Sequence, residues 1–307
     1  MLQYFLKRLL AVVLLACGIS VLVFMLIRLI PGDPVRTLLG TNAGSPEMLE
    51  RLTRQLGLDQ PLLTQYVLWF GNALQGDFGY SFVTQRSVSS LIAANFPATL
   101  QLTLAALALS VFFGTLLGTL AALRRKTMTD TVGMGIALVF MSIPSFWLGL
   151  LLILTFAVTL PWFQVAGGTS WDGLVLPACT LALGTIGINA RFVRSSIIAA
   201  SGQAHVVTAR AKGITRVQLF VRHILRNAML PIATVIGLQI GNLLSGTVIV
   251  ETVFSRPGLG RLLVDAILAK DYLTVQAVVL IISVIFALTN FLVDLLYPML
   301  DPRIARR

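Results

Sequence analysis

The sequence predicts an all-α membrane protein with six transmembrane helices, and three observations support that fold class. Six apolar runs are close to or longer than the ~20 residues that a helix needs to cross a bilayer. Hydrophobic residues make up 57% of the chain and charged residues 11%, whereas soluble domains carry about 25% charged residues. Basic residues gather in short segments beside the apolar runs, as the positive-inside rule describes. The predicted spans cover residues 9–30, 100–123, 132–156, 174–198, 230–250 and 275–296.

The first span, residues 9–30, follows Lys7 and Arg8. A cleaved signal peptide is the alternative, but the apolar core of such a peptide is usually about 7–15 residues long. This run is longer, and no small-x-small cleavage site follows it. We therefore predict a retained helix whose N-terminus lies in the cytoplasm.

The long hydrophilic stretch that follows, residues 31–99, is predicted to be an external loop because its charges nearly balance and it succeeds the first span. Two short helices are predicted within it. One covers residues 45–57, and the other starts at Pro61 and places Tyr66 and Trp69 on one side. We expect both helices to lie at the membrane interface, packed over the spans.

The third span, residues 132–156, is interrupted by Ser142-Ile143-Pro144-Ser145. Proline frees a backbone carbonyl and kinks a helix. Within a bilayer such a kink is tolerated only against protein or a water-filled cavity. Ser142, Pro144 and Ser145 are therefore candidates for a translocation pathway, with simple packing as the alternative.

The fifth span, residues 230–250, contains Gly237-x-x-x-Gly241, a pattern that permits two helices to approach closely. Gln239 and Asn242 lie beside these glycines. Their amides either pair with neighbouring helices or line a hydrophilic path, and on the second interpretation they join the pathway candidates.

The distribution of basic residues predicts the topology. Fifteen of the 23 Lys and Arg fall in segments predicted to be cytoplasmic, including the run 124–126 after the second span. Seven fall in long external segments, where the positive-inside rule gives them little weight, and Arg28 ends the first span. Six spans with both termini in the cytoplasm satisfy this distribution. The net charge of +11 therefore reflects topology and does not indicate a nucleic-acid partner.

The cytoplasmic loop, residues 199–229, is the most basic segment of the chain, and with its flanks it holds both histidines and no acidic residue. Thr215 and Gln218 form a capping box, and Pro231 is predicted to end the helix that they start. A preceding helical stretch is separated from it by a turn at Gly213. The loop is thus predicted to form a knob of two short helices joined at a glycine.

The second of these helices has a predicted apolar face made of Val217, Phe220, Val221 and Ile224, at positions i, i+3, i+4 and i+7. Two interpretations fit a basic amphipathic helix. It could rest on anionic lipid, or it could be a docking element for a soluble partner.

Short phrases along the chain favour the docking interpretation. P-G-D-P, L-G-L-D-Q-P, G-D-F-G-Y-S, S-R-P-G-L-G-R and D-P-R-I resemble phrases at similar places in the peptide/nickel family of ABC-importer permeases. V-T-A-R-A-K-G, followed by L-P, resembles the loop that engages the ATPase in such permeases, although Val207 and Thr208 stand where that motif has Glu and Ala. The resemblance implies an ATPase-coupling loop that contains His205, Thr208, Ala209, Arg210, Lys212, Gly213 and Arg216.

The resemblance also implies the setting. Residues 1–307 would form one permease domain with the ABC-importer permease fold, in a bacterial inner membrane. Its partners would be membrane lipid, a second homologous permease, two ATP-binding subunits and an extracytoplasmic solute-binding protein. Such a permease works by alternating access. The expected substrates are dipeptides and oligopeptides, with nickel or a metal chelate as the alternative.

The sequence carries no machinery for catalysis. It contains no G-x-x-x-x-G-K-[ST] phosphate loop and no H-E-x-x-H zinc motif, so ATP and Mg are expected on the partner subunits. Between residues 100 and 250 the acidic residues are Asp130 and Asp172, both predicted in loops. A secondary carrier coupled to an ion gradient, the main alternative, normally needs ionisable groups at membrane depth. A membrane anchor is a further alternative.

Overall fold

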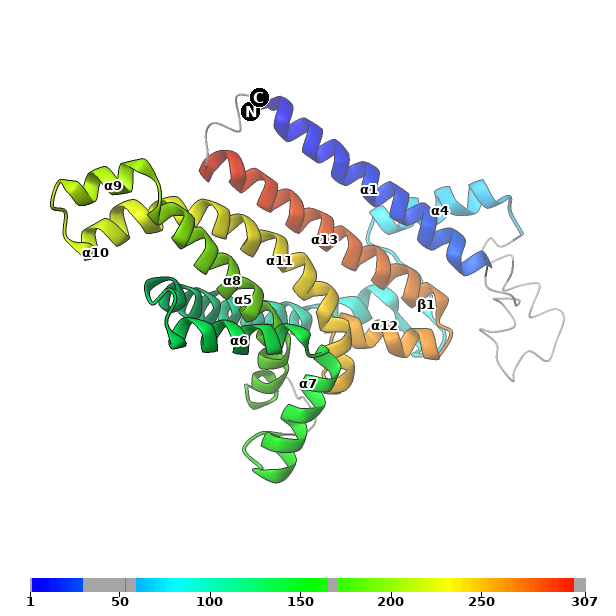
Figure 1. Ribbon diagram of the computed structural model, residues 1–307. Coiled ribbons are helices and arrows are strands. Elements are labelled where there is room, and N and C mark those ends of the chain that lie inside the picture. Colours follow the sequence, from blue (N-terminus) through cyan, green and yellow to red (C-terminus); the bar gives the residue numbers. More distant parts are fainter. Residues whose placement is uncertain (1, 30–52, 54–58, 165–170, 301–307) are drawn as a thin grey trace.

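The structure, a computed structural model, describes residues 2–29, 53, 59–164 and 171–300, and most of them are helical (Figure 1). The long helices are α1 (Leu2–Leu29), α5 (Val88–Leu123), α6 (Met128–Ser142), α8 (Asp172–Ser201), α11 (Arg226–Val253) and α13 (Tyr272–Leu300). The shorter elements are α4 (Leu62–Leu74), β1 (Tyr80–Ser81), β2 (Arg86–Ser87), α7 (Ser145–Leu152), α9 (Ala204–Ala211), α10 (Arg216–Gln218), α12 (Leu259–Leu268) and two π-helical segments, η2 (Ile153–Thr159) and η3 (Leu219–Leu225).

Among the described residues, five helices are long and apolar enough to cross a membrane, namely α1, α5, α8, α11 and α13. A sixth span is formed if α6 and the α7–η2 segment count as one bent pair. The predicted all-α membrane fold is therefore confirmed. Of the predicted external loop, residues 30–52 and 54–58 lie outside the described residues, and with them most of the helix predicted over 45–57.

The third span is broken rather than kinked, which corrects the prediction of one helix over 132–156. α6 ends at Ser142, α7 starts at Ser145, and the two meet at 103°. Ile143 between them is extended, with φ −81° and ψ 125°. Residues that precede proline avoid the helical region because the proline ring clashes with their backbone, so Pro144 ends one helix and begins the next.

Small residues bring α5, α6 and α8 into close contact. A Cβ atom on Gly118 of α5 would lie 2.5 Å from the Ala190 carbonyl oxygen of α8, and one on Gly187 of α8 would lie 2.5 Å from the Ala137 carbonyl oxygen of α6. No larger residue fits at these two positions without a shift of the backbone. The three spans are therefore packed backbone to backbone.

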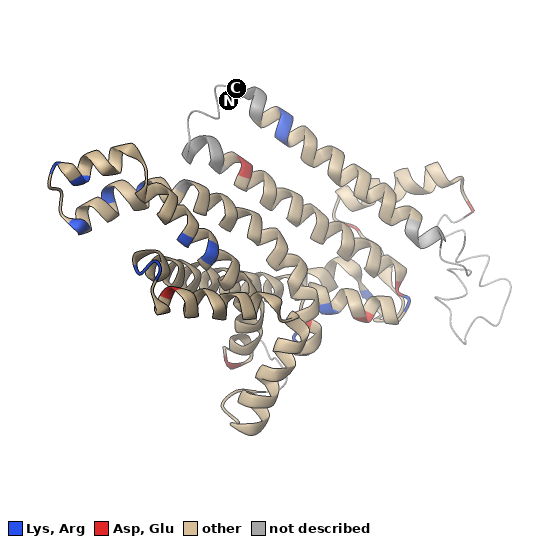
Figure 2. Ribbon diagram, viewed as in Figure 1, with Lys and Arg blue, Asp and Glu red and all other residues tan. Residues whose placement is uncertain are grey.

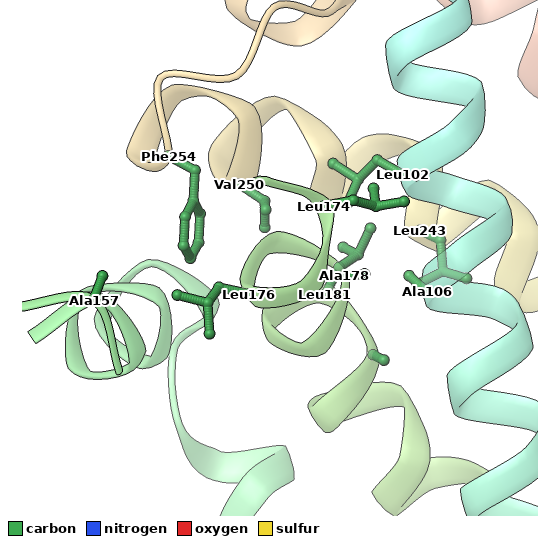
Figure 3. Packing of buried hydrophobic residues seen from close by; sticks show 11 residues of the cluster. Leu102, Ala106, Ala157, Leu174, Leu176, Ala178, Leu181, Leu243, Val250 and Phe254 are labelled. Atoms are coloured by element: carbon green, nitrogen blue, oxygen red, sulfur yellow. The ribbon is translucent and has the colours of Figure 1, made fainter. Parts of the chain in front are cut away.

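A hydrophobic cluster joins α5 and α8 to α11, and Figure 3 shows its side chains. Leu102 comes from α5, Leu181 from α8 and Leu243 from α11, while Phe254 extends from the end of α11 towards Leu176. On the other side of α11, Cβ atoms on Gly237 and Gly241 would both lie 2.4 Å from side-chain atoms of α13. The close approach predicted from the Gly-x-x-x-Gly pattern is confirmed.

The N-terminal helix packs on α13, and Arg8 of α1 forms an ion pair with Asp294 of α13 at 2.9 Å. This contact places the start of α1 and the end of α13 at the same end of the bundle (Figure 1). Near the other end of α1, the Ser20 hydroxyl and the Tyr66 hydroxyl of α4 are 2.8 Å apart. Phe24 contacts the rings of both Tyr66 and Trp69, so the aromatic side predicted for this helix is confirmed.

The phrase G-D-F-G-Y-S leads into the hairpin of β1 and β2, which is fastened to α13. The Ser81 hydroxyl donates to the Asp271 carboxylate at 2.5 Å, and the Thr274 hydroxyl donates to the same oxygen at 2.7 Å. The side chains of Ser81, Asp271 and Thr274 are all buried. The hairpin is thereby fixed at the start of α13.

Candidate functional site

The basic loop folds as the predicted knob, here residues 204–225, and projects from one end of the bundle (Figure 1). α9 and α10 are joined by a turn in which Gly213 has φ +76°, a conformation that favours glycine. Figure 2 shows Lys and Arg on the knob and no acidic residue. Of the predicted coupling residues, the exposed ones are His205, Thr208, Arg210, Lys212, Gly213 and Arg216.

Ala209, the remaining predicted coupling residue, is buried and belongs to the core that anchors the knob. It packs in one cluster with Val206 of α9, with Leu219 and Ile224 of η3, and with residues near the end of α8 such as Val193. The knob is therefore continuous with the hydrophobic interior of the bundle. Its orientation is set by packing, and the exposed basic residues are carried on that rigid base.

A polar contact at the start of α9 adds to this anchoring. The Asn227 amide nitrogen lies 2.9 Å from His205 Nε2 and donates to the His223 carbonyl oxygen at 2.7 Å. Because the amide nitrogen is a donor, His205 Nε2 accepts in this arrangement. Two of the residues that meet here are the two histidines of the chain.

The apolar face predicted for the second knob helix is wrong in part. Ile224 is buried and Phe220 partly buried, but Val217 is 72% and Val221 56% exposed, while the buried partner of Ile224 is Leu219. The segment η3 has π-helical geometry, whose hydrogen bonds join residues five apart. Leu219 and Ile224 are five apart, so they share a side that α-helical spacing does not predict.

The start of this helix is as predicted, but its end is not. Thr215 Oγ1 accepts from the Gln218 backbone N–H at 3.4 Å. Pro231 was expected to end the helix, whereas α11 runs through it to Val253. Proline is tolerated in spanning helices because neighbouring structure satisfies the freed backbone groups. As a result α10, η3 and α11 form one continuous helical rod from the knob to the far end of the bundle.

Three exposed valines lie among the basic residues of the knob. Val207 of α9 is 57% exposed, and Val217 and Val221 on the rod are the other two. Exposed apolar side chains among polar ones are available for contact with a partner protein. The knob thus presents an apolar and basic surface that its own core does not use.

The five predicted pathway residues are not gathered at one place. Ser145 lines a pocket of about 220 Å³ at the bend between α6 and α7, together with Thr180 and Thr185 of α8. Ser142 and Pro144 are exposed beside the bend, and the Ser142 hydroxyl donates to Leu138 of its own helix.

The other two pathway candidates lie on α11, and they differ from each other. Asn242 is exposed, whereas Gln239 is 4% exposed and neither its side-chain oxygen nor its nitrogen has a hydrogen-bond partner. An unpaired buried amide is energetically unfavourable. Gln239 therefore remains a candidate for a contact that this single chain does not provide.

Sequence reasoning missed an ion pair that joins α6 to α8. Asp130 was predicted in a loop but lies in the first turn of α6, 4% exposed. Arg194 of α8 binds both its carboxylate oxygens, with Nε and Nη2 at 2.6 and 2.7 Å, and the Lys126 backbone N–H donates at 3.0 Å. The sequence signal for this ion pair was Asp130 itself, an acidic residue three positions after Thr127 in a region with few acidic residues.

A second polar cluster lies at the end of the bundle opposite the knob, and sequence analysis did not predict it. We call Thr99, Gln101, Gly173, Glu251 and residues 255–261 the hub. The Glu251 side chain is fully buried and accepts hydrogen bonds from the Thr99 hydroxyl at 2.6 Å and from the Gly260 backbone N–H at 2.7 Å. The phrase S-R-P-G-L-G-R forms this loop around the carboxylate.

Arg256 extends the hub to a third span. It is fully buried, and its guanidinium donates to the Gly173 carbonyl oxygen at 3.3 Å and to Gln101 Oε1 at 3.4 Å. Burial lowers the pKa of the Arg256 guanidinium, and the nearby Glu251 charge opposes that shift. The hub therefore links α5, α8 and α11 through side chains of one short loop.

No arrangement of three or more His, Cys, Asp or Glu suitable for a metal ion occurs among the residues that the structure describes. Cys17 and Cys179 are free thiols on α1 and α8.

Two family models match the chain. The model described as "Binding-protein-dependent transport system inner membrane component" matches residues 114–306, and its N-terminal companion matches residues 1–103. The glutathione transport system permease protein GsiC of Escherichia coli K12 is 43% identical over 304 residues, which is 99% of each chain. GsiC of Salmonella typhi is 44% identical over 304 residues, again 99% of each chain.

Solved structures show the same fold at low sequence identity. A chain of the methionine ABC transporter MetNI, in an inward-facing form, aligns with a TM-score of 0.59 and 18% identity, over 69% of this chain and 96% of that one. A chain of an amino acid ABC transporter with histidines aligns with a TM-score of 0.57 and 17% identity, over 69% of this chain and 94% of that one. With a family model over most of its length and full-length relatives, this chain belongs to the inner-membrane permeases of binding-protein-dependent ABC importers, in their peptide/nickel family.

Proposed function

We propose that this chain forms half of the translocation pathway of an importer for short peptides and moves them by alternating access. The observation that carries the proposal is the continuous rod of α10, η3 and α11, which joins the knob directly to a membrane span. Support for the substrate class comes from the full-length relatives named for glutathione, a tripeptide. The comparisons do not support the nickel alternative better than the peptide one.

The knob is proposed as the docking site for a partner ATPase. Val207, Val217 and Val221 would enter an apolar cleft of that subunit, while Arg210, Lys212 and Arg216 would pair with acidic groups at its rim. ATP and Mg would be bound by the ATPases. Closure of two ATPase subunits would pull the knob, and because its core is fixed to α8 and the rod, the spans would move with it.

The bend at Pro144 is proposed as part of the peptide pathway. Spanning helices that are broken within the membrane often carry transport sites, because the break exposes backbone groups to a cavity. Here the pocket at the break presents the hydroxyls of Ser145, Thr180 and Thr185. Gln239 of α11 would contribute in another state of the complex or at the contact with a second permease.

The proposed assembly contains this permease, a second homologous permease, two ATPases and a solute-binding protein, in a bacterial inner membrane. The knob and both chain termini would face the cytoplasm. The concentration of basic residues in and around the knob supports this orientation, as does the Arg8–Asp294 pair, which places the start of α1 and the end of α13 together.

The docking role can be tested by purifying the tagged chain from its native membrane in mild detergent and identifying its partners by mass spectrometry. Val217→Asp should remove the ATPase from the complex, since it places a charge in the apolar contact, while the binding protein and second permease remain. Val83→Asp, the same substitution at an exposed valine on the β1–β2 turn, is the control. Retention of the ATPase by Val217→Asp would exclude the knob as its docking site.

The substrate is tested with the same complex in proteoliposomes supplied with its binding protein. ATP-dependent uptake of labelled glutathione or a dipeptide, and not of nickel, is the expected result. Uptake driven by an ion gradient without ATP would contradict the importer mechanism.

A further inference from the structure

Helix α12 has no cap of its own, and the hub supplies one from two other helices. Its N-cap residue is Gly258, which has no side chain to accept a hydrogen bond. The first N–H groups of a helix lack partners within the helix. Here Leu259 N–H donates to Thr99 Oγ1 at 2.8 Å, and the N–H groups of Gly260 and Arg261 donate to Glu251 Oε2 at 2.7 and 3.2 Å.

The direction of these hydrogen bonds is fixed by chemistry. Thr99 Oγ1 accepts from Leu259, so its single proton is free to donate to Glu251 Oε1, 2.6 Å away. A carboxylate can accept all three bonds, and its charge is favoured at a helix N-terminus. Thr99 and Glu251 are both buried, and in a low-dielectric site such charge-assisted bonds are strong.

The backbone around the carboxylate leaves little room for adjustment. A Cβ atom on Gly258 would lie 2.2 Å from Glu251 Cδ, and one on Gly260 would lie 2.4 Å from Val248 Cα. These two glycines permit the loop to close over the carboxylate. The loop therefore has one arrangement in which all of the hub's hydrogen bonds form.

Packing beneath the hub is less complete than the hub itself. A pocket of about 80 Å³ lies between α5, α11 and α13, directly below Thr99 and Leu259. Leu259 still packs in an apolar cluster with Val88 of α5 and Val278 of α13. The polar contacts of Thr99 and Glu251 add a directional link to this packing.

We propose that Glu251 and Thr99 are positioning residues that fasten α12 to the outer ends of α5 and α11, so that these three elements move as one rigid unit during transport. The inference rests on the proposed function. Arg256 extends the same unit to the start of α8. A force applied to α12 from outside the membrane then reaches α11 directly, and through the rod it reaches the knob.

The coupling is tested on the reconstituted complex with its binding protein by measuring peptide taken up per ATP hydrolysed. Thr99→Val removes the hydroxyl that donates to Glu251. Glu251→Gln replaces the oxygen that accepts from the Thr99 hydroxyl with an NH2 group, which cannot accept. Each should lower this ratio about tenfold, since each removes a hydrogen bond that joins α5 to the charged Glu251 side chain. Thr99→Ser keeps the hydroxyl and should retain the ratio.

Thr103→Val is the matched control, because Thr103 is also buried on α5 but its hydroxyl bonds within its own helix, to the Thr99 carbonyl oxygen. A purely structural role would reduce the amount of complex and leave the ratio unchanged. A wild-type ratio in assembled Thr99→Val complexes would overturn the inference, even if Glu251→Gln fails to assemble. Absence of ATP-dependent uptake in the wild type would instead refute the proposed function.

Rigidity is measured directly with spin labels at Ala94 of α5 and Thr252 of α11, both exposed near the hub, after Cys17 and Cys179 are replaced by serine. The distance distribution should be the same with and without ATP in the wild type and should broaden in Thr99→Val. A wild-type distance that changes with ATP would show that α5 and α11 move relative to each other, contrary to the inference.

Discussion

At the scale of single residues, Gly213 carries a conformational demand that the rest of the knob does not share. Its φ of +76° is unfavourable for other residues, yet a Cβ atom there would meet nothing within 4 Å. The requirement is therefore in the backbone and not in the packing. The sequence predicted the turn correctly because glycine between two helical stretches is the usual residue for it.

Gly213→Val should uncouple transport while the chain still inserts and assembles. A β-branched residue in the left-handed region costs about 1–3 kcal/mol, which the turn can relieve by tilting α9 away from the rod. ATP-dependent uptake per assembled complex is the measurement, and a large loss is expected. Gly202→Val is the control, because Gly202 is also exposed, in the turn between α8 and the knob, but has φ −88°. Normal uptake in Gly213→Val would argue against a coupling role for the turn.

Asp130 and Arg194, 64 residues apart in the chain, form an ion pair that sequence analysis did not predict. Asp130→Asn should destabilise the protein, because the Arg194 charge then loses its partner, but by less than the loss of a fully buried pair, since 30% of the Arg194 side chain is exposed. Thermal unfolding of the purified complex measures this loss.

The double variant Asp130→Asn with Arg194→Gln should recover part of the stability, because no unpaired charge then remains. Asp265→Asn breaks the exposed pair between Arg261 and Asp265, and we expect it to change stability by less than about 1 kcal/mol. Equal effects of Asp130→Asn and Asp265→Asn would mean that the α6–α8 pair contributes no more than a surface ion pair.

At the scale of elements, apolar run length predicted which segments are helices, and it failed where two prolines had opposite effects. Pro144 separates α6 from α7, whereas Pro231 lies inside α11. Both stand in apolar surroundings, so local sequence does not distinguish them. The difference depends on what the neighbouring helices satisfy and fill, which is a tertiary property.

The π-helical segment η3 is the other element that sequence patterns could not give. Hydrophobic periodicity of 3.6 assigned Val217 and Val221 to the buried face together with Ile224. In the structure Ile224 is buried, but its buried companion is Leu219, five residues before it, and the two valines are exposed. The two valines that were expected inside are therefore the ones available to a partner. The change from α-helical to π-helical spacing thus accounts both for the error in the predicted core and for the two valines on the docking surface.

The pocket at the bend can be tested by cysteine labelling in a chain whose own cysteines are replaced by serine. Ser145→Cys should react with a water-soluble thiol reagent, since the proposed pathway is hydrated. Val139→Cys on α6 should react at least tenfold more slowly, because Val139 is 57% exposed on an apolar face that would contact lipid. Similar rates at the two positions would mean that the bend is not water-accessible.

At the scale of the whole molecule, the sequence predicted the fold class and the family, because both depend on features that are repeated along the chain. It did not predict which helices touch. The hub joins residues more than 150 positions apart, such as Thr99 and Glu251, and its sequence signal was only a phrase shared with other permeases. Long-range polar contacts of this kind leave no periodicity to detect.

The orientation of the molecule is a prediction that labelling from one side can check. Lys212→Cys on the knob should react only when a membrane-impermeant thiol reagent reaches the cytoplasmic side, and Val83→Cys on the β1–β2 turn only when it reaches the outer side. Intact and opened spheroplasts provide the two conditions. Reaction of both positions from one side would contradict the odd number of crossings, three, that the topology places between them.

The unbroken rod from Arg216 to Val253 also limits how such permeases can be recombined. A flexible docking loop could be exchanged between related permeases without regard to its length. In a continuous helix, each residue added or removed rotates everything beyond it by about 100°. One residue gained or lost between Leu219 and Arg226 would turn Gly237 and Gly241 away from α13. Chimeric transporters should therefore be joined in the turns at Gly202 and Gly213, where the chain can absorb a change in length, and never within the rod.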